Sequence, residues 1–223
     1  MTIHIQTSAR DVTDIIEHTP SVSPYRTVLK RVFDLAFVLC ILPVILPVIL
    51  LFAGLVALDG SNPFFIQRRV GKDGRVFSMI KLRSMVVDAE SRLLEHLAAD
   101  PEARREWERC QKLTSDPRIT PVGRLIRKTS ADELPQFLNV LFGQMSVVGP
   151  RPMLPSQREM YPGQAYYALK PGITGFWQIG DRHATSFADR ARYDAAYYDR
   201  MSLRTDLGVI LRTVQVVLRG TGA

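Results

Sequence analysis

The chain has 223 residues, 46% of them hydrophobic and 23% charged, which is close to ordinary globular composition and excludes wholesale disorder and collagen-like repeats. Its length allows one domain and an additional segment. The first 25 residues hold one of the 29 basic and three of the 22 acidic residues, so residues 26–223 carry a net charge of +9, a surplus that favours phosphate-bearing partners such as nucleotides, anionic lipids or nucleic acids.

Residues 1–25 are predicted to form a flexible leader, because they alternate small polar and apolar residues and end in a stretch of Ser and Pro. The next segment, 26–59, has no charged residue between Leu35 and Leu58. A straight helix of that length would reach about 36 Å, enough to cross a hydrocarbon core of about 30 Å. The apolar stretch starts too late and runs too long for a signal peptide.

Two features of this apolar segment argue against a straight crossing. Pro43 and Pro47 each remove a backbone donor and clash with the preceding turn, which predicts a bend near the middle. Basic residues flank both ends, Lys30-Arg31 before the segment and Arg68-Arg69 after it, and basic flanks prefer the cytoplasmic side of a membrane. A helix that dips into one leaflet and returns satisfies both observations, and a spanning helix is the alternative.

The chain beyond the apolar segment begins with a hairpin pattern. Two β-rich runs at 64–70 and 75–81 flank the turn sequence Gly71-Lys-Asp-Gly74, which predicts two antiparallel strands. Charged amphipathic stretches at 84–99 and 101–113 then predict two helices.

A short basic helix or turn is predicted at 122–127. The next helix is expected to begin at Ser130, which has the spacing of a capping box with Glu133, and to stop at Gly143. From Ser146 onward the chain is rich in Gly and Pro, a composition typical of functional loops.

The last predicted element is an amphipathic helix near the C-terminus. Its apolar stripe consists of Leu207, Ile210, Leu211, Val214, Val217 and Leu218, opposite Arg204, Arg212, Gln215 and Arg219. This pattern fits a helix that lies in a membrane interface, and it fits equally a helix packed on the domain's own core.

Candidate chemistry gathers around Asp132 and Glu133, which follow the basic pair Arg127-Lys128. A carboxylate at a helix N-terminus beside these cations stays ionised, and the free N–H groups there attract phosphate oxygens. Asp132 is therefore a candidate nucleophile toward phosphorus, and the two carboxylates together are candidate ligands of Mg²⁺. The same residues are also explained by a capped helix with acids at its N-terminus, where the helix dipole favours them.

Other basic residues are candidates for the same phosphates. Arg151 lies in the rigid turn Gly149-Pro-Arg-Pro152, and Lys81 and Arg83 follow the hairpin. Trp177 is a candidate for stacking on a base or for a structural role. The sequence contains no Walker loop, no GxGxxG and no paired Cys/His set, so the common nucleotide cradles and a zinc site are not expected.

Several motifs occur in a fixed order along the chain. They are Lys30-Arg31-x-Phe33-Asp34, Gln67-x-Arg69-x-Gly71-x-x-Gly74-x-x-Phe77, Lys81-x-Arg83-Ser84-Met85, Asp132-Glu133-Leu-Pro-Gln136-x-x-Asn139, Met145-Ser-x-x-Gly149-Pro-Arg-Pro152 and Pro171-Gly-Ile-Thr-Gly175. With this set, the chain resembles the bacterial sugar transferases, the monotopic phosphoglycosyl transferases that start exopolysaccharide and other envelope glycan synthesis. The resemblance covers nearly everything from Lys30 to the C-terminus. Within the family, the chain is similar to the short members that consist of the core alone.

The resemblance implies an α+β monotopic membrane protein. Segment 26–59 would be a re-entrant helix with both ends cytoplasmic, and 60–223 a mostly helical catalytic domain with a small β-hairpin, at the cytoplasmic face of the bacterial inner membrane. Family members transfer a sugar 1-phosphate, here expected to be of glucose or galactose, from a UDP-sugar to undecaprenyl phosphate and release UMP. In the family pattern Asp132 would be the nucleophile and Glu133 would assist, with Mg²⁺ at the diphosphate.

One departure from the family pattern concerns the helix break. The family usually has a Ser-Pro pair there, whereas this chain has Leu46-Pro47 and an additional Pro43. Two alternatives to a transferase are a hydrolase sharing the Asp-phosphate step and a membrane-tethered basic module that binds anionic lipid or nucleic acid without catalysis. Nucleic acid is not an expected partner, because carboxylates among the bases of the proposed site would repel a polyanion.

Overall fold

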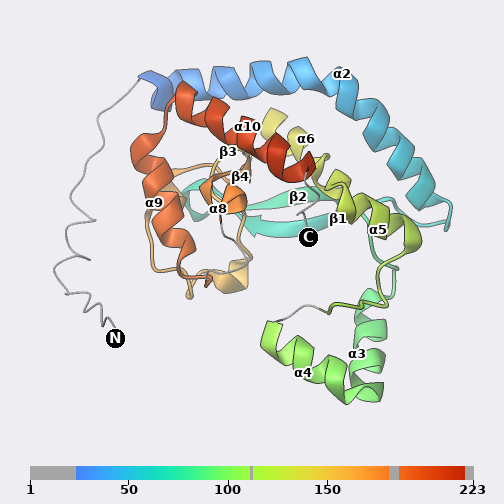
Figure 1. Ribbon diagram of the computed structural model, residues 1–223. Helices are drawn as coiled ribbons and strands as arrows, with labels where there is room; N and C mark the ends of the chain where they lie inside the picture. The colour runs from blue at the N-terminus through green and yellow to red at the C-terminus, as the bar shows by residue number, and fades with distance from the viewer. Residues whose placement is uncertain (1–23, 111–112, 181–185, 219–223) are drawn as a thin grey trace, which may run out of the picture.

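A long bent helix, α2 (Lys30–Ala57), lies across a helix-rich body that contains two small sheets (Figure 1). The computed structural model describes residues 24–110, 113–180 and 186–218. The other elements are η1 (Tyr25–Leu29), β1 (Phe64–Val70), η2 (Lys72–Gly74), β2 (Val76–Leu82), α3 (Ala89–Ala99), α4 (Pro101–Cys110), α5 (Pro121–Lys128), η3 (Ala131–Glu133), α6 (Gln136–Leu141), β3 (Ser146–Val148), η4 (Pro155–Gln157), α7 (Ala165–Ala168), β4 (Gly172–Thr174), α8 (Phe176–Ile179), α9 (Arg190–Arg200) and α10 (Leu203–Leu218).

Helix α2 is continuous through Pro43 and Pro47, and it runs along the top of the body before turning downward (Figure 1). By length and composition it is apolar enough to cross a membrane. Its two halves pack on two different cores. Val38 joins a cluster with residues of β2, β3, α9 and α10, whereas Ile49 and Ala53 join one with residues of β2, α5 and η3. Most of its outward-facing side chains are exposed and apolar.

Polar contacts tie both ends of α2 to the same body. Near the start, the buried Asp34 carboxylate accepts hydrogen bonds from Ser146 Oγ at 2.8 Å and the Val147 amide at 3.1 Å. Just after the end, Asp59 accepts two hydrogen bonds from the Arg83 guanidinium, both at 2.7 Å. Neither end of the helix therefore points away from the domain.

The predicted hairpin is confirmed. Strands β1 and β2 pair antiparallel, with Phe64 opposite Leu82 and Val70 opposite Val76. The sequence did not predict the second sheet, in which β3 and β4 pair in parallel. This pairing needs glycine, because a Cβ added to Gly172 would lie 2.1 Å from the Gly149 amide nitrogen.

The prediction that a helix begins at Ser130 is wrong. Ser130 has a left-handed backbone with φ 55°, its side chain caps nothing, and its amide donates to the Arg127 carbonyl. It follows the last residues of α5 in the αL position that commonly ends a helix. Helix α6 begins only at Gln136, and Gly143, with φ 77°, follows its end as predicted.

Two further boundaries differ from expectation. The helix predicted from Ser84 begins at Ala89, because the preceding residues pair with the 118–119 segment: the Val86 amide donates to the Arg118 carbonyl. Helix α4 ends at Cys110, and 111–112 lie outside the described residues.

Helix α10 confirms the predicted C-terminal helix. Asp206 and Val209 are buried, whereas Leu207, Leu211 and Val214 on the predicted apolar stripe are exposed. The helix thus packs on the body through one face and presents part of its stripe at the surface. The Leu218 side chain and Arg219 lie outside the described residues.

The chain's first described residues pack against this last helix. Tyr25, which the sequence placed in the leader, is buried and donates to Asp206 at 2.6 Å. Asp206 also accepts from Tyr197 at 2.8 Å and forms an ion pair with Lys30 at 2.9 Å. Residues 1–23 of the predicted leader lie outside the described residues.

Candidate active site

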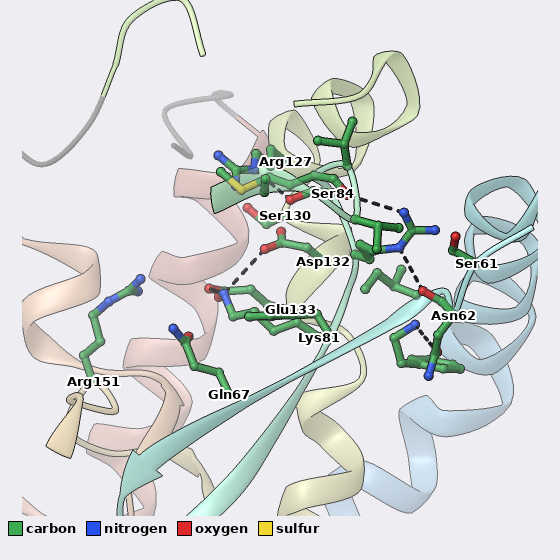
Figure 2. A pocket seen from close by; sticks show the side chains of 18 residues that line it. Ser61, Asn62, Gln67, Lys81, Ser84, Arg127, Ser130, Asp132, Glu133 and Arg151 are labelled. Atoms are coloured by element: carbon green, nitrogen blue, oxygen red, sulfur yellow. Dashed lines mark hydrogen bonds and ion pairs between the residues drawn. The ribbon is translucent and has the colours of Figure 1, made fainter. Parts of the chain in front are cut away.

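A cavity of about 730 Å³ lies between the hairpin, α5, η3 and the loop after β3 (Figure 2). Its lining includes the candidate catalytic and phosphate-binding residues Lys81, Arg83, Arg127, Asp132, Glu133 and Arg151, whereas the candidate stacking residue Trp177 is not part of it. These residues come from separate parts of the sequence, so the fold brings them to one place.

The two carboxylates share one cation. Lys81 Nζ lies 3.0 Å from Glu133 Oε1 and 3.5 Å from Asp132 Oδ2 (Figure 2). All three side chains are largely but not fully buried. Because η3 is a single tight turn, it directs both carboxylates of consecutive residues toward the same side chain of β2.

Burial raises the pKa of Asp132 above its usual value, and the ammonium of Lys81 opposes that shift. The Glu133 carboxylate raises the pKa further, whereas the Arg127 guanidinium lowers it. Asp132 is thus a partly desolvated carboxylate whose ionisation depends on the cations around it. Such a group is weakly hydrated and available to react.

Arg127 is oriented by a neighbouring hydroxyl. Its Nε donates to Ser84 Oγ at 2.9 Å, and Ser84 lines the same cavity (Figure 2). The terminal nitrogens of this guanidinium make no hydrogen bond within the described parts of the chain. Arg127 is therefore a pre-positioned donor suited to a phosphate oxygen.

The guanidinium of Arg83 is already hydrogen-bonded to the protein, whereas a phosphate-binding arginine needs free donors. Its nitrogens donate to Asp59, to the carbonyls of Asn62 and Met85, and to the Val56 carbonyl. These bonds fasten the end of α2 to β2. The geometry thus supports an anchoring role for Arg83, and the predicted phosphate contact gains no support from it.

Arg151 lies near two other arginines, Arg69 and Arg190, which the sequence did not predict to be part of the site. Its guanidinium carbon lies 5.7 Å from the centre of the Trp177 ring, and that of Arg190 lies 4.2 Å from the same centre. Burial and the positive charge of Arg151 lower the pKa of both Arg190 and Arg69 to about 10. This concentration of buried positive charge favours an anionic ligand.

A signal for Arg69 was present in the sequence. In the observed hairpin register, Phe65 faces Lys81 and Arg69 faces Phe77, so the side chains of 65, 67 and 69 share a face with Lys81. Applying this alternation to the predicted hairpin would have placed Gln67 and Arg69 near the site. Arg190 had no comparable local signal, whereas Trp177, already a candidate from the sequence, lies beside Arg151 and Arg190.

A magnesium ion fits the two carboxylates. Within the described residues no three His, Cys, Asp or Glu side chains form a metal-binding group. Mg²⁺ does not need three, since it usually takes one or two protein carboxylates and completes its octahedron with water and substrate phosphates. Asp132 Oδ1 makes no hydrogen bond to any described residue, which leaves one oxygen of this carboxylate available.

An apolar cavity of about 400 Å³ adjoins the polar one. Its walls are formed by α2, α6, α8 and α10, with Phe37, Ile41, Leu134, Ile210 and Val214 among its lining residues. Ser130, Glu133 and Arg151 line both cavities. The amide nitrogen and oxygen of Gln178, also on its wall, are buried without a hydrogen-bond partner among the described residues.

The chain matches the family model described as "Bacterial sugar transferase" over residues 25–220. It is 45% identical over 197 residues to the UDP-galactose-lipid carrier transferase of Erwinia amylovora and 44% identical over 197 residues to the undecaprenyl-phosphate galactose phosphotransferase of Salmonella typhimurium. Each alignment covers 87% of this chain and 41% of the relative, so the chain spans about two fifths of their length. It is 38% identical over 212 residues to the exopolysaccharide production protein ExoY of Sinorhizobium fredii, covering 94% of both chains.

Proposed function

The chain belongs to the bacterial sugar transferase family, and on that premise we propose that it transfers a hexose 1-phosphate, of galactose or glucose, from a UDP-sugar to undecaprenyl phosphate. The observation that carries the proposal is the junction of two unlike cavities. The polar cavity suits a charged nucleotide sugar, and the apolar cavity suits an isoprenoid chain. Ser130, Glu133 and Arg151 at the junction would face both substrates. The corresponding cellular role is the first step of exopolysaccharide synthesis.

In the first half-reaction, an Asp132 carboxylate oxygen attacks the sugar-bearing phosphorus of the UDP-sugar. The new O–P bond forms as the bridging P–O bond of the diphosphate breaks, and the bridging oxygen leaves with UMP. The product is an acyl phosphate that joins Asp132 to the sugar 1-phosphate. Arg127, held by Ser84, and Arg151 would stabilise the negative charge on the phosphate oxygens.

In the second half-reaction, a phosphate oxygen of undecaprenyl phosphate attacks the same phosphorus. The bond to Asp132 breaks, the carboxylate is regenerated, and the product is the lipid-linked diphosphate sugar. Glu133 would assist by accepting the remaining proton of the acceptor phosphate, a role supported by its place at the junction of the cavities.

Replacing Lys81 with Met is expected to shift the acidic limb of the pH–rate profile for UMP release upward by at least about one pH unit. Asp132 acts as a carboxylate, and activity is lost as the pH falls through its pKa. Without the Lys81 ammonium, the effect of burial on that pKa is less opposed, so protonation begins at higher pH. A Lys128→Met control, which removes an exposed charge outside the cavity lining, should keep the wild-type limb. An unchanged limb in the Lys81 variant would contradict this electrostatic role.

Mg²⁺ is the proposed cofactor, with Asp132 and Glu133 as its protein ligands. When bound, it would neutralise charge on the diphosphate oxygens of the donor. Excess EDTA is therefore expected to lower UMP release at least about a hundredfold, and added Mg²⁺ should restore it. Turnover that persists undiminished in EDTA would count against a metal role.

We further propose that α2 is a re-entrant helix in the bacterial inner membrane and that the catalytic body lies at the cytoplasmic face. Supporting this arrangement, both halves of α2 pack on the same body, so a straight crossing would draw part of that body into the bilayer. The bend at Pro43 and Pro47 lets both ends return to one side. The exposed apolar faces of α2 and α10 would contact lipid.

Thiol labelling tests this topology. In a background with Cys40 and Cys110 replaced by Ser, Val28→Cys and Leu58→Cys place one thiol near each end of α2, at positions that are exposed. An impermeant maleimide should label neither variant in intact cells and both after permeabilisation of the inner membrane. Labelling of one end from outside would show that the helix spans.

Incubating the purified chain with a panel of UDP-sugars, with and without undecaprenyl phosphate, tests the overall function. The transferase releases UMP and links the sugar phosphate to the lipid. Release of UMP with free sugar phosphate as the final product, even with the lipid present, would indicate a hydrolase. Lipid binding without UMP release from any donor would indicate a binding module.

A further inference from the structure

A third cavity, of about 140 Å³, lies at the N-terminal end of α2 and shares no lining residue with the polar and apolar cavities. Its walls are the start of α2, the β3 strand, the segment before β4 and the C-terminal part of α9. Five cationic side chains line it: Arg26, Lys30, Arg31, Lys72 and Lys170. Neither half-reaction uses any of these residues.

The acidic residue on the wall of this cavity is already engaged. Asp34 pairs with Lys30 at 2.9 Å and also accepts from Ser146 and the Val147 amide. Lys30 Nζ forms two ion pairs, one with Asp34 Oδ1 and one with Asp206 Oδ2, each at 2.9 Å. These contacts neutralise Lys30 and leave no acid for the other cations.

Among the described residues, the remaining cations of this cavity have no carboxylate as an ion-pair partner. Arg31 donates to the carbonyl oxygens of Val140 and Leu141, which fixes its position but does not neutralise its charge. Lys72 and Lys170 form no ion pair within the described residues. Arg31 Nη2 and Lys170 Nζ lie 3.5 Å and 3.7 Å from where a Cβ on Gly143 would stand, so both cationic groups border the same small space beside Gly143.

The convergence has an electrostatic cost. Burial lowers the pKa of Lys170, and the neighbouring charges of Arg31, Lys72 and Lys30 lower it further, with Asp34 opposing them. A bound anion would relieve this repulsion and form charge-assisted hydrogen bonds with the same groups. The cavity is large enough for a phosphate group.

The position of the cavity indicates where such a phosphate comes from. Val28, Leu29 and Val32, at the same end of the helix, are more than half exposed and apolar. An apolar surface beside a cationic pocket whose side chains are partly exposed matches the boundary between acyl chains and head groups. We propose that this cavity binds the phosphate of an anionic phospholipid head group, with Arg31, Lys72 and Lys170 as its ligands.

Thermal unfolding of the purified full-length chain in a non-ionic detergent, with short-chain phosphatidylglycerol as the probe, tests the proposal. The lipid should raise the Tm of the wild-type chain in a saturable way. Lys72→Gln combined with Lys170→Gln should weaken the apparent affinity at least about tenfold, since two charge-assisted contacts are lost. The matched double variant Arg75→Gln, Lys128→Gln removes two exposed charges elsewhere and should respond as wild type does.

The single variant Lys170→Gln separates a ligand role from a structural one. Without lipid its Tm should equal or exceed that of the wild type, because a repelled cation is removed, while its response to lipid should fall. A Lys170 that serves only the fold would lower the basal Tm and leave the response to lipid unchanged, which would overturn the proposal. An equal response of both double variants, or an equal shift with inorganic phosphate at the same concentration, would also overturn it.

Discussion

Asp132→Asn is expected to lower UMP release from the UDP-sugar at least about a thousandfold, with or without the lipid acceptor. The amide keeps the size of the side chain but cannot form the acyl phosphate. The measurement is UMP produced in single-turnover conditions, together with the mass of the intact protein. The wild-type chain should gain the mass of a sugar phosphate, and the variant should not.

Two controls sharpen this experiment. Asp73→Asn changes an exposed aspartate in the hairpin turn, at a positive φ that Asn tolerates, and should have wild-type activity. Glu133→Gln should retain part of the first half-reaction, because the nucleophile is still present. Normal UMP release by the Asp132 variant would rule out its role as the nucleophile, whatever the state of Glu133.

Val214→Glu is expected to uncouple the two half-reactions. Val214 lines the apolar cavity, and a carboxylate there would repel the acceptor phosphate and hydrate the path of the isoprenoid chain. Transfer to lipid should fall at least about a hundredfold, whereas UMP release in the absence of acceptor should remain near the wild-type burst. UMP release is measured without acceptor, and transfer is measured in a parallel reaction that contains the lipid, with radiolabelled donor sugar and extraction of the lipid product.

Leu211→Glu is the matched control for this variant. Leu211 is exposed on the same helix and has the same apolar character, but it does not line the cavity. Both substitutions would weaken contact of α10 with a membrane to a similar degree. If they reduce lipid transfer equally, the effect comes from the membrane surface, and the apolar cavity is not the acceptor site.

Local signals predicted the parts of the fold that depend on neighbouring residues. The hairpin followed from two β-rich runs around an Asp-Gly turn, and the two strands pair antiparallel as predicted. The stop after α6 followed from Gly143. The six candidate residues of the polar cavity came from local charge patterns, and five of them also belong to the ordered motifs that carry the family resemblance.

The errors arose where two local rules compete or where contacts are distant in sequence. Ser130 has the spacing of an N-cap with Glu133. In the structure, however, it follows the end of α5 with a left-handed backbone and terminates that helix. The pairing of β3 with β4 depends on the close approach of Gly149 and Gly172, which no periodicity reveals. The contact of Arg83 with Asp59, 24 residues earlier, is likewise not visible in a local pattern, and the phosphate-binding role of Arg83 stays a prediction.

The buried cluster at Asp206 has a consequence for how the chain is made. Tyr25 and Asp206 are 181 residues apart, so at ribosomal rates Asp206 is synthesised roughly 10 to 40 s after Tyr25. During that time α2 has emerged, while Ser146 and Val147, the partners of Asp34, and the segment that ends at Asp206 have yet to be translated. The nascent helix must therefore be held by the bilayer or by a chaperone until the last helix docks and completes the cluster.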